Sequence, residues 1–157
     1  GLVTVTGGKW TTYRAMAEDV LSKCMADALL PHRPGGATLK QLLVGADAGA
    51  SGRHPLSQAS DLSVYGREAA FVEALPGSGR QLGGGLTEAM VRFAVRHEYA
   101  RTVEDVLARR VRLLFLDARL ACSLAPAVGA IVAEESGRDP EIAAFEALAA
   151  KYLHLPA

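Results

Sequence analysis

The sequence predicts a mainly α protein, in which a helical bundle of five to six helices follows a short strand–turn–helix segment. Apolar residues recur with helical spacing from residue 61 onward. The β-branched residues at 3–6 are typical of a strand, and Gly7 and Gly8 follow them directly. The 157 residues, half of them hydrophobic, are enough for one compact core that needs neither metals nor disulfides.

The first element after the glycine pair is a predicted helix over residues 11–30. Its periodic apolar residues are Met16, Val20, Leu21, Cys24 and Ala28. Pro31 and Pro34 are expected to end it. Residues 31–60 are rich in proline and glycine and are interpreted as a surface loop that links two domains.

Helices are predicted throughout the rest of the chain. The first covers residues 61–75, a flexible glycine-rich stretch covers 77–85, and a second helix covers 87–99. Thr102 and Asp105 have the spacing of a capping box at the start of a third helix, which ends near residue 110.

Two further helices complete the predicted bundle. One covers residues 114–136, and Pro126 is expected to kink or split it because proline removes a backbone donor. In the last helix Asp139 is the expected cap and Pro140 the first residue. Its apolar face consists of Ile142, Phe145, Leu148, Ala149 and Tyr152.

Charge and cysteine content argue against general nucleic-acid binding and against a zinc site. The 17 basic residues balance the 17 acidic ones, which argues against a nucleic-acid-binding protein. Cys24 and Cys122 lie in apolar helical patterns and are expected to be buried free thiols. Their spacing fits no zinc motif, so no metal site is predicted.

No stretch reaches the roughly 18 apolar residues of a membrane span. Residues 113–133 come nearest, but Asp117 and Arg119 interrupt them. No signal peptide is expected, and a chain that begins with Gly1 is interpreted as part of a longer protein.

The glycine turn before the first helix is the most informative candidate site. Glycines allow a ligand to approach the backbone, and the first N–H groups of a helix lack intrahelical partners. The partial positive charge of the helix end and the ammonium of Lys9 both favour an anionic ligand. A phosphate, a carboxylate or the electron-rich edge of a flavin fits this site, and an ordinary strand–turn–helix connection is the alternative.

Two separate segments resemble one enzyme family. Residues 7–19 read Gly-Gly-Lys-Trp-Thr-Thr-Tyr-Arg-Ala-Met-Ala-Glu-Asp. This segment resembles the end of the flavin domain in FAD-dependent glycerol-3-phosphate dehydrogenases. Residues 91–110 (Val-Arg-Phe-Ala-Val-Arg-His-Glu-Tyr-Ala-Arg-Thr-Val-Glu-Asp-Val-Leu-Ala-Arg-Arg) and 112–118 resemble the helical C-terminal domain of the same family. Met90 stands where the family usually has an acid, and Gly85 and Leu86 stand where it has Pro-Tyr.

The resemblance implies a domain organisation and a set of site residues. Residues 1–30 would be the terminal strand and helix of the FAD-binding domain, 31–60 a linker, and 61–157 the helical C-terminal domain. The cofactor-binding residues would be Gly8, Lys9, Trp10 and Thr11, with the N–H groups of Gly8, Lys9 and Trp10 facing the pyrimidine end of the flavin. Lys9 would also reach the substrate phosphate.

The activity of the complete protein also follows from the resemblance. It would oxidise sn-glycerol 3-phosphate to dihydroxyacetone phosphate with FAD, and a membrane quinone, or oxygen in oxidase relatives, would accept the electrons. The protein would be cytoplasmic and peripheral on the inner (cytoplasmic) membrane. Its partners would be its own FAD-binding domain, sn-glycerol 3-phosphate and a quinone, and no nucleic acid is expected. A contact with the membrane surface and a homodimer are left open as further partners.

This chain by itself is expected to be inactive and to bind no FAD. It has no Gly-x-Gly-x-x-Gly fingerprint after a strand, and no catalytic residue is assigned within it. The alternative from another class is a non-catalytic helical interaction module that binds a protein partner or a membrane surface.

An arginine-rich segment, residues 92–119, holds seven arginines and four acids. The first interpretation is helix-surface charge with spaced pairs: Glu98 with Arg101 or Arg109, and Asp105 with Arg109. The other interpretations are a docking surface for the flavin domain or an oligomer contact, a site for anionic lipid headgroups, and a DNA-reading helix-turn-helix over residues 87–116.

Overall fold

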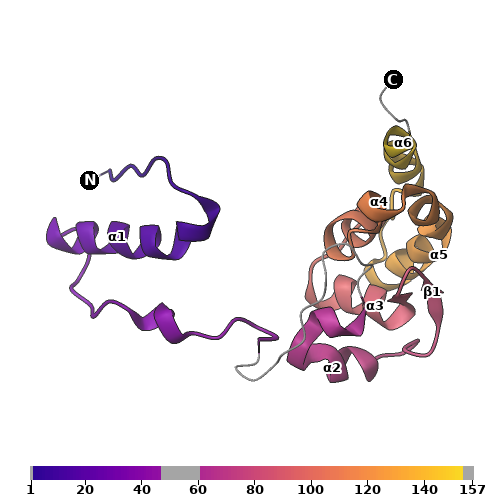
Figure 1. The fold of residues 1–157 in the computed structure, drawn as a ribbon, viewed down its shortest axis with the longest axis horizontal. Coiled ribbons are helices and arrows are strands. Elements are labelled where there is room, and N and C mark those ends of the chain that lie inside the picture. The colour runs from indigo at the N-terminus through magenta and orange to yellow at the C-terminus, as the bar shows by residue number, and fades with distance from the viewer. Residues whose placement is uncertain (1, 47–60, 154–157) are drawn as a thin grey trace. The chain divides into compact units, whose positions relative to one another are not determined.

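The computed structural model describes residues 2–46 and 61–153 (Figure 1). The chain divides into two compact units, Gly1–Leu43 (the first unit) and Val44–Ala157 (the second unit). Part of the predicted linker, residues 47–60 with His54, lies outside the described residues, as does His154.

The first unit contains one long helix. A 3-10 turn, η1 (Trp10–Thr12), leads into α1 (Tyr13–Ala26), and a second 3-10 turn, η2 (Ala37–Lys40), follows within the predicted loop. Residues 2–9 have no regular secondary structure, so the strand predicted over 3–6 does not form here. A strand requires a hydrogen-bonded neighbour, and the described residues of this unit contain no second strand.

The second unit is a helical bundle with one small hairpin, which confirms the mainly α fold class. Its elements, in chain order, are η3 (Leu62–Glu68), α2 (Ala69–Glu73), β1 (Gln81–Gly83), β2 (Leu86–Thr87), α3 (Glu88–His97), the π-helix η4 (Asp105–Arg110), α4 (Leu113–Leu116), α5 (Ala118–Ser136) and α6 (Ile142–Tyr152). The antiparallel hairpin β1–β2 replaces the predicted flexible stretch and lies beside α5 (Figure 1). Gly83 and Gly84 have positive φ and allow its tight turn.

Helix α3 lies in the middle of the bundle. Its residues from Glu88 to Val95 are all buried, because α5 packs along it and the neighbouring segments cover its other side. Helix α5 in turn packs against α4 and α6. The largest fully buried side chains of the core come from all these elements: Phe145, Leu86, Met90, Leu107, Leu114, Val72, Val91, Val103, Val106, Val128 and Val132.

The helix predicted over 114–136 breaks at Asp117 and not at Pro126. The Asp117 carboxylate accepts a hydrogen bond from the Leu120 N–H at 2.9 Å and so caps α5. Helix α5 then continues through Pro126. Packing against α3 and α6 compensates for the backbone bond that this proline removes, so the expectation of a split at Pro126 is wrong.

Two other helix starts in the second unit are set by local interactions or backbone conformation. The predicted capping box is confirmed: the Asp105 N–H donates to Thr102 Oγ1 at 3.2 Å, and the Thr102 N–H donates to the Asp105 carboxylate at 3.1 Å. The last helix starts at Ile142 and not at Pro140, because Glu141 adopts a left-handed conformation with φ 58°.

Phe145 anchors α6 to the bundle and is 1% exposed, whereas Tyr152 on the same helix is 50% exposed. We expect Phe145→Ala to lower the free energy of unfolding of the chain by about 3–4 kcal/mol, because it leaves a cavity in the core. Tyr152→Ala is the matched control and should cost less than about 1 kcal/mol. Urea denaturation followed by circular dichroism measures both, and equal losses would contradict the placement of Phe145 in the core.

Candidate functional site

The candidate site in the first unit is built on a glycine turn. Gly7 and Gly8 have φ values of 80° and 97°, in the left-handed region that favours glycine. A Cβ atom on Gly8 would lie 2.2 Å from the Met16 sulfur on α1. The positive φ of this turn favours glycine at position 8, and the Met16 side chain of α1 packs against the Gly8 backbone.

Lys9 follows the turn and has an extended backbone, with φ −111° and ψ 150°. Its N–H donates to Thr12 Oγ1 at 3.3 Å, and the Thr12 hydroxyl donates back to the Lys9 carbonyl at 2.9 Å. The Thr12 N–H also donates to this carbonyl, at 2.9 Å. This arrangement resembles one half of a capping box, in which the side chain at the third helical position accepts the N–H of the cap.

Three backbone donors remain at the start of the helix. Among the hydrogen bonds of residues 2–46, none is donated by the N–H of Gly8, Trp10 or Thr11. The N-terminal end of η1 and α1 carries a partial positive charge, and the ammonium of Lys9 adds a full positive charge. Unpaired donors and positive charge fit the electron-rich pyrimidine edge of a flavin.

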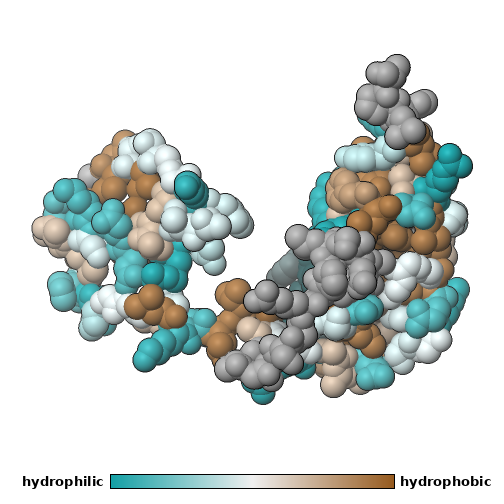
Figure 2. Space-filling model, in the orientation of Figure 1, coloured by the Kyte–Doolittle hydropathy of each residue, from teal (hydrophilic) through white to brown (hydrophobic). Residues whose placement is uncertain are grey.

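The first unit exposes apolar side chains at its surface. Trp10 is 88% exposed, and its ring lies 5.8 Å from that of Tyr13. No described residue of the first unit is buried, and hydrophobic residues lie at its surface (Figure 2). An open apolar groove of about 830 Å³ separates α1 from the chain segment that follows it. A segment of this size without a core is typical of a piece that packs against other parts of a larger domain.

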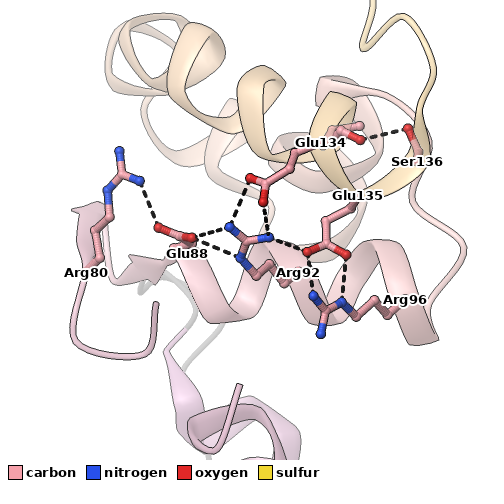
Figure 3. A network of polar contacts seen from close by, with 8 residues as sticks. Arg80, Glu88, Arg92, Arg96, Glu134, Glu135 and Ser136 are labelled. Carbon is pink, nitrogen blue, oxygen red and sulfur yellow. Dashed lines mark hydrogen bonds and ion pairs between the residues drawn. The ribbon is translucent and has the colours of Figure 1, made fainter. Parts of the chain in front are cut away.

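The second unit contains a network of charged side chains between α3 and α5 (Figure 3). Arg92 is only 9% exposed and contacts Glu88 at 2.5 Å, Glu134 at 3.0 Å and also Glu135. Arg96 contacts Glu135 at 2.6 Å. Arg80, which precedes the hairpin, extends the network to Glu88 at 2.8 Å. These ion pairs link helices whose partner residues are about forty positions apart in the sequence.

The carboxyl groups of the second unit differ in their electrostatic environment. Hydrogen bonds from Arg92 and Arg80 lower the pKa of Glu88, and those from Arg96 and Arg92 lower the pKa of Glu135. Burial acts to raise the pKa of Asp105, but hydrogen bonds from the Arg101 and Thr102 N–H groups lower it overall. Burial raises the pKa of Glu98, against the opposing charge of Arg110.

The arginine-rich segment mostly forms pairs within the second unit, as the first interpretation expects. Arg92, Arg96, Arg109 and Arg110 all contact acidic side chains, and Arg101 lies over the ring of Tyr99 at 5.9 Å.

Two predicted pairs in this segment have different outcomes. The pair Asp105–Arg109, at 2.7 Å, is confirmed. The predicted partners of Glu98 are wrong: Glu98 contacts Arg110 at 3.8 Å. It follows the end of α3, and the π-helix brings Arg110 next to it.

The described residues hold no group of three or more potential metal ligands, and none of their helices has the length and apolar character to cross a bilayer. Cys24 and Cys122 are both free thiols, as predicted, but they are half-buried and not fully buried. Around Cys122 the buried positions of α5 belong to other residues of its apolar pattern, whereas α1, which holds Cys24, has no buried residue.

Three contacts of the site and the network were not predicted. They are Thr12 with Lys9, Met16 beside Gly8, and Arg92 with the two acids of α5. The three-residue spacing of Lys9 and Thr12 is a signal for the first contact. The four-residue spacing of Glu88 and Arg92 indicates only the pair within α3.

The second unit is a helical bundle, and a glycine turn followed by a helix precedes it in the sequence. Residues 35–143 match the family described as the C-terminal domain of alpha-glycerophosphate oxidase. The chain belongs to this family. No solved structure is a significant match to it.

Curated relatives match most of the chain. The mitochondrial glycerol-3-phosphate dehydrogenase of Arabidopsis thaliana is 33% identical over 86% of this chain and 26% of the relative. The mitochondrial glycerol-3-phosphate dehydrogenase of Schizosaccharomyces pombe is 33% identical over 88% of this chain and 28% of the relative. Glycerol-3-phosphate dehydrogenase 1 of Mycobacterium bovis is 40% identical over 72% of this chain and 23% of the relative. The chain therefore spans about a quarter of the length of these relatives.

These findings confirm the resemblance deduced from the two sequence segments. They favour the dehydrogenase interpretation over a non-catalytic interaction module. The family implies FAD as the cofactor of the parent enzyme.

The buried guanidinium of Arg92 leads to a first prediction for the network. We expect Arg92→Met to lower the free energy of unfolding of the chain at pH 7 by about 2 kcal/mol, because it leaves the Glu88 and Glu135 carboxylates without their shared partner. Arg96→Met, whose side chain is 39% exposed, is the control and should cost less than about 1 kcal/mol. Chemical denaturation measures both, and a smaller loss for Arg92→Met than for the control would contradict the central place of Arg92.

The same network predicts a pH dependence. The pKa values of Glu88 and Glu135 are lowered in the folded chain from the ordinary value of 4.5. Their contribution to stability is therefore complete above about pH 5 and is lost as the pH falls through the lower folded-state values. Denaturation midpoints between pH 3 and pH 7 should fall more steeply in the wild type than in Arg92→Met. Parallel pH profiles of the two proteins would count against the network.

Proposed function

We propose that this chain is the C-terminal part of an FAD-dependent glycerol-3-phosphate dehydrogenase. The complete protein oxidises sn-glycerol 3-phosphate to dihydroxyacetone phosphate and passes the electrons to a quinone. The observation that carries the proposal is the glycine turn, where unpaired N–H groups and Lys9 meet at the start of one helix. The family membership and the similar dehydrogenases support it.

The residues of the turn hold the cofactor in this proposal. The unpaired N–H groups of Gly8, Trp10 and Thr11 donate to the pyrimidine edge of the flavin. Lys9 contributes its ammonium and not its N–H, because the N–H is bonded to Thr12. When bound, FAD accepts the two electrons of the oxidation. Preorganised donors stabilise negative charge there without having to reorient.

Lys9 has a second role at the substrate. Its ammonium is a compact charge that fits the phosphate of sn-glycerol 3-phosphate or the reduced flavin. Since the phosphate is dianionic near neutral pH, a nearby cation favours binding and orients the substrate. No catalytic acid or base is assigned to this chain.

The proposal also assigns a part of the enzyme to each segment of the chain. Residues 1–30 form the end of the FAD-binding domain, 31–60 link it to the next domain, and 61–157 form the helical C-terminal domain. The exposed apolar residues of the first unit pack against the remainder of the flavin domain. The enzyme is a homodimer on the cytoplasmic side of the inner membrane.

The test uses the full-length protein that contains this chain. We expect it to bind FAD and to reduce a quinone analogue with sn-glycerol 3-phosphate as donor. Lys9→Met should lower kcat/KM about 100-fold, because a preorganised charge is lost at the site. The control Lys151→Met changes an exposed lysine of α6 and should leave kcat/KM unchanged. A protein without FAD, or without activity on this substrate, would refute the proposal.

A second experiment addresses the chain by itself. We expect residues 1–157 to show no turnover of sn-glycerol 3-phosphate and no stoichiometric FAD binding, because the sequence lacks the dinucleotide fingerprint. Equilibrium dialysis with FAD and a dye-reduction assay measure these properties. Tight FAD binding by this chain would show that the site needs no other domain.

A further inference from the structure

We propose that Thr12 is the positioning residue of the site: its hydroxyl sets the backbone of Lys9 and thereby places the Lys9 ammonium. The inference rests on the proposed function and assigns a specific task to a residue that the sequence motif leaves without one. It is carried by the two hydrogen bonds between one side chain and both backbone groups of Lys9.

The geometry limits the freedom of Lys9. Thr12 Oγ1 accepts the Lys9 N–H at 3.3 Å and donates to the Lys9 carbonyl at 2.9 Å. Lys9 follows two glycines with positive φ, so no neighbouring side chain on its N-terminal side restrains it. The Thr12 contacts therefore hold the extended φ and ψ of Lys9 from which its side chain projects.

Thr12 itself is held in place by α1. Its residue is the last of η1, and α1 begins at Tyr13. Its hydroxyl also lies 3.5 Å from the Met16 sulfur, and the same sulfur fills the space next to Gly8. The helix, Thr12 and the glycine turn thus form one connected unit. The Thr12 N–H also donates to the Lys9 carbonyl at 2.9 Å, so the Thr12 hydroxyl is the side-chain part of this link, and the only part that restrains the Lys9 N–H.

The backbone N–H groups of the turn differ in whether they already have an acceptor within the chain. The Lys9 N–H is used within the chain, whereas the N–H groups of Gly8, Trp10 and Thr11 donate no hydrogen bond within residues 2–46. The backbone on either side of Lys9 is therefore left for a ligand. Lys9 acts through its ammonium alone, which makes its side-chain placement decisive for the substrate or the flavin.

The test compares variants of the full-length enzyme that contains this chain. Thr12→Val keeps the shape of the side chain and removes the hydroxyl, and Thr12→Ser keeps the hydroxyl. We expect Thr12→Val to lower kcat/KM for sn-glycerol 3-phosphate about tenfold at unchanged FAD content, the scale for losing one or two neutral hydrogen bonds. Thr12→Ser should stay within about twofold of the wild type. Thr6→Val, an exposed threonine ahead of the turn, is the matched control.

A double-mutant cycle separates positioning from a general structural role. If Thr12 acts through Lys9, Thr12→Val should change kcat/KM less than about twofold in the Lys9→Met background. Additive losses in the cycle, or loss of FAD from Thr12→Val, would overturn the inference while leaving the proposed function intact. A wild-type enzyme that contains no FAD, or does not oxidise the substrate, would instead refute the proposed function, and the inference with it.

Discussion

The ion pairs of Arg92 join α3 to α5. The buried guanidinium of α3 has carboxylate partners on both helices. The Arg92 side chain is almost completely enclosed, and a guanidinium in such a place requires carboxylates on more than one side. Glu88 supplies one from the same helix, and Glu134 and Glu135 supply the others from α5. The long helix α5 is thereby held against α3, and Arg80, which precedes the hairpin, joins the network through Glu88.

The two units of the chain have opposite physical characters. The second unit has a core of fully buried side chains, and several of its arginines pair with its own acidic side chains. By contrast, no described residue of the first unit is buried. The chain spans about a quarter of the length of its relatives, and the first unit exposes apolar side chains such as Leu2 and Trp10. In the function proposed above, other residues of the flavin domain cover them. The proposed site has the same property, because the turn offers donors and a charge for only one edge of a ligand.

Local patterns predicted much of the fold. The helices over 13–26, 88–97 and 142–152 follow from apolar spacing, and the Thr102–Asp105 capping box follows from residues three positions apart. The break at Asp117 was missed because proline is the stronger signal for a helix end. Packing of α5 against its neighbours overrides that signal at Pro126.

The sequence by itself determined the family, the helical class and the candidate turn, because these depend on residue identity and spacing within one segment. The tertiary structure alone decided which acids meet Arg92 and that Glu98 contacts Arg110, because these partners come from different elements. The strand expected at 3–6 depends in the same way on neighbours far away in the chain, and residues 2–9 have no regular structure here. Hydrogen-bonded pairs within a turn are encoded locally, whereas burial and strand pairing depend on what the rest of the fold brings alongside.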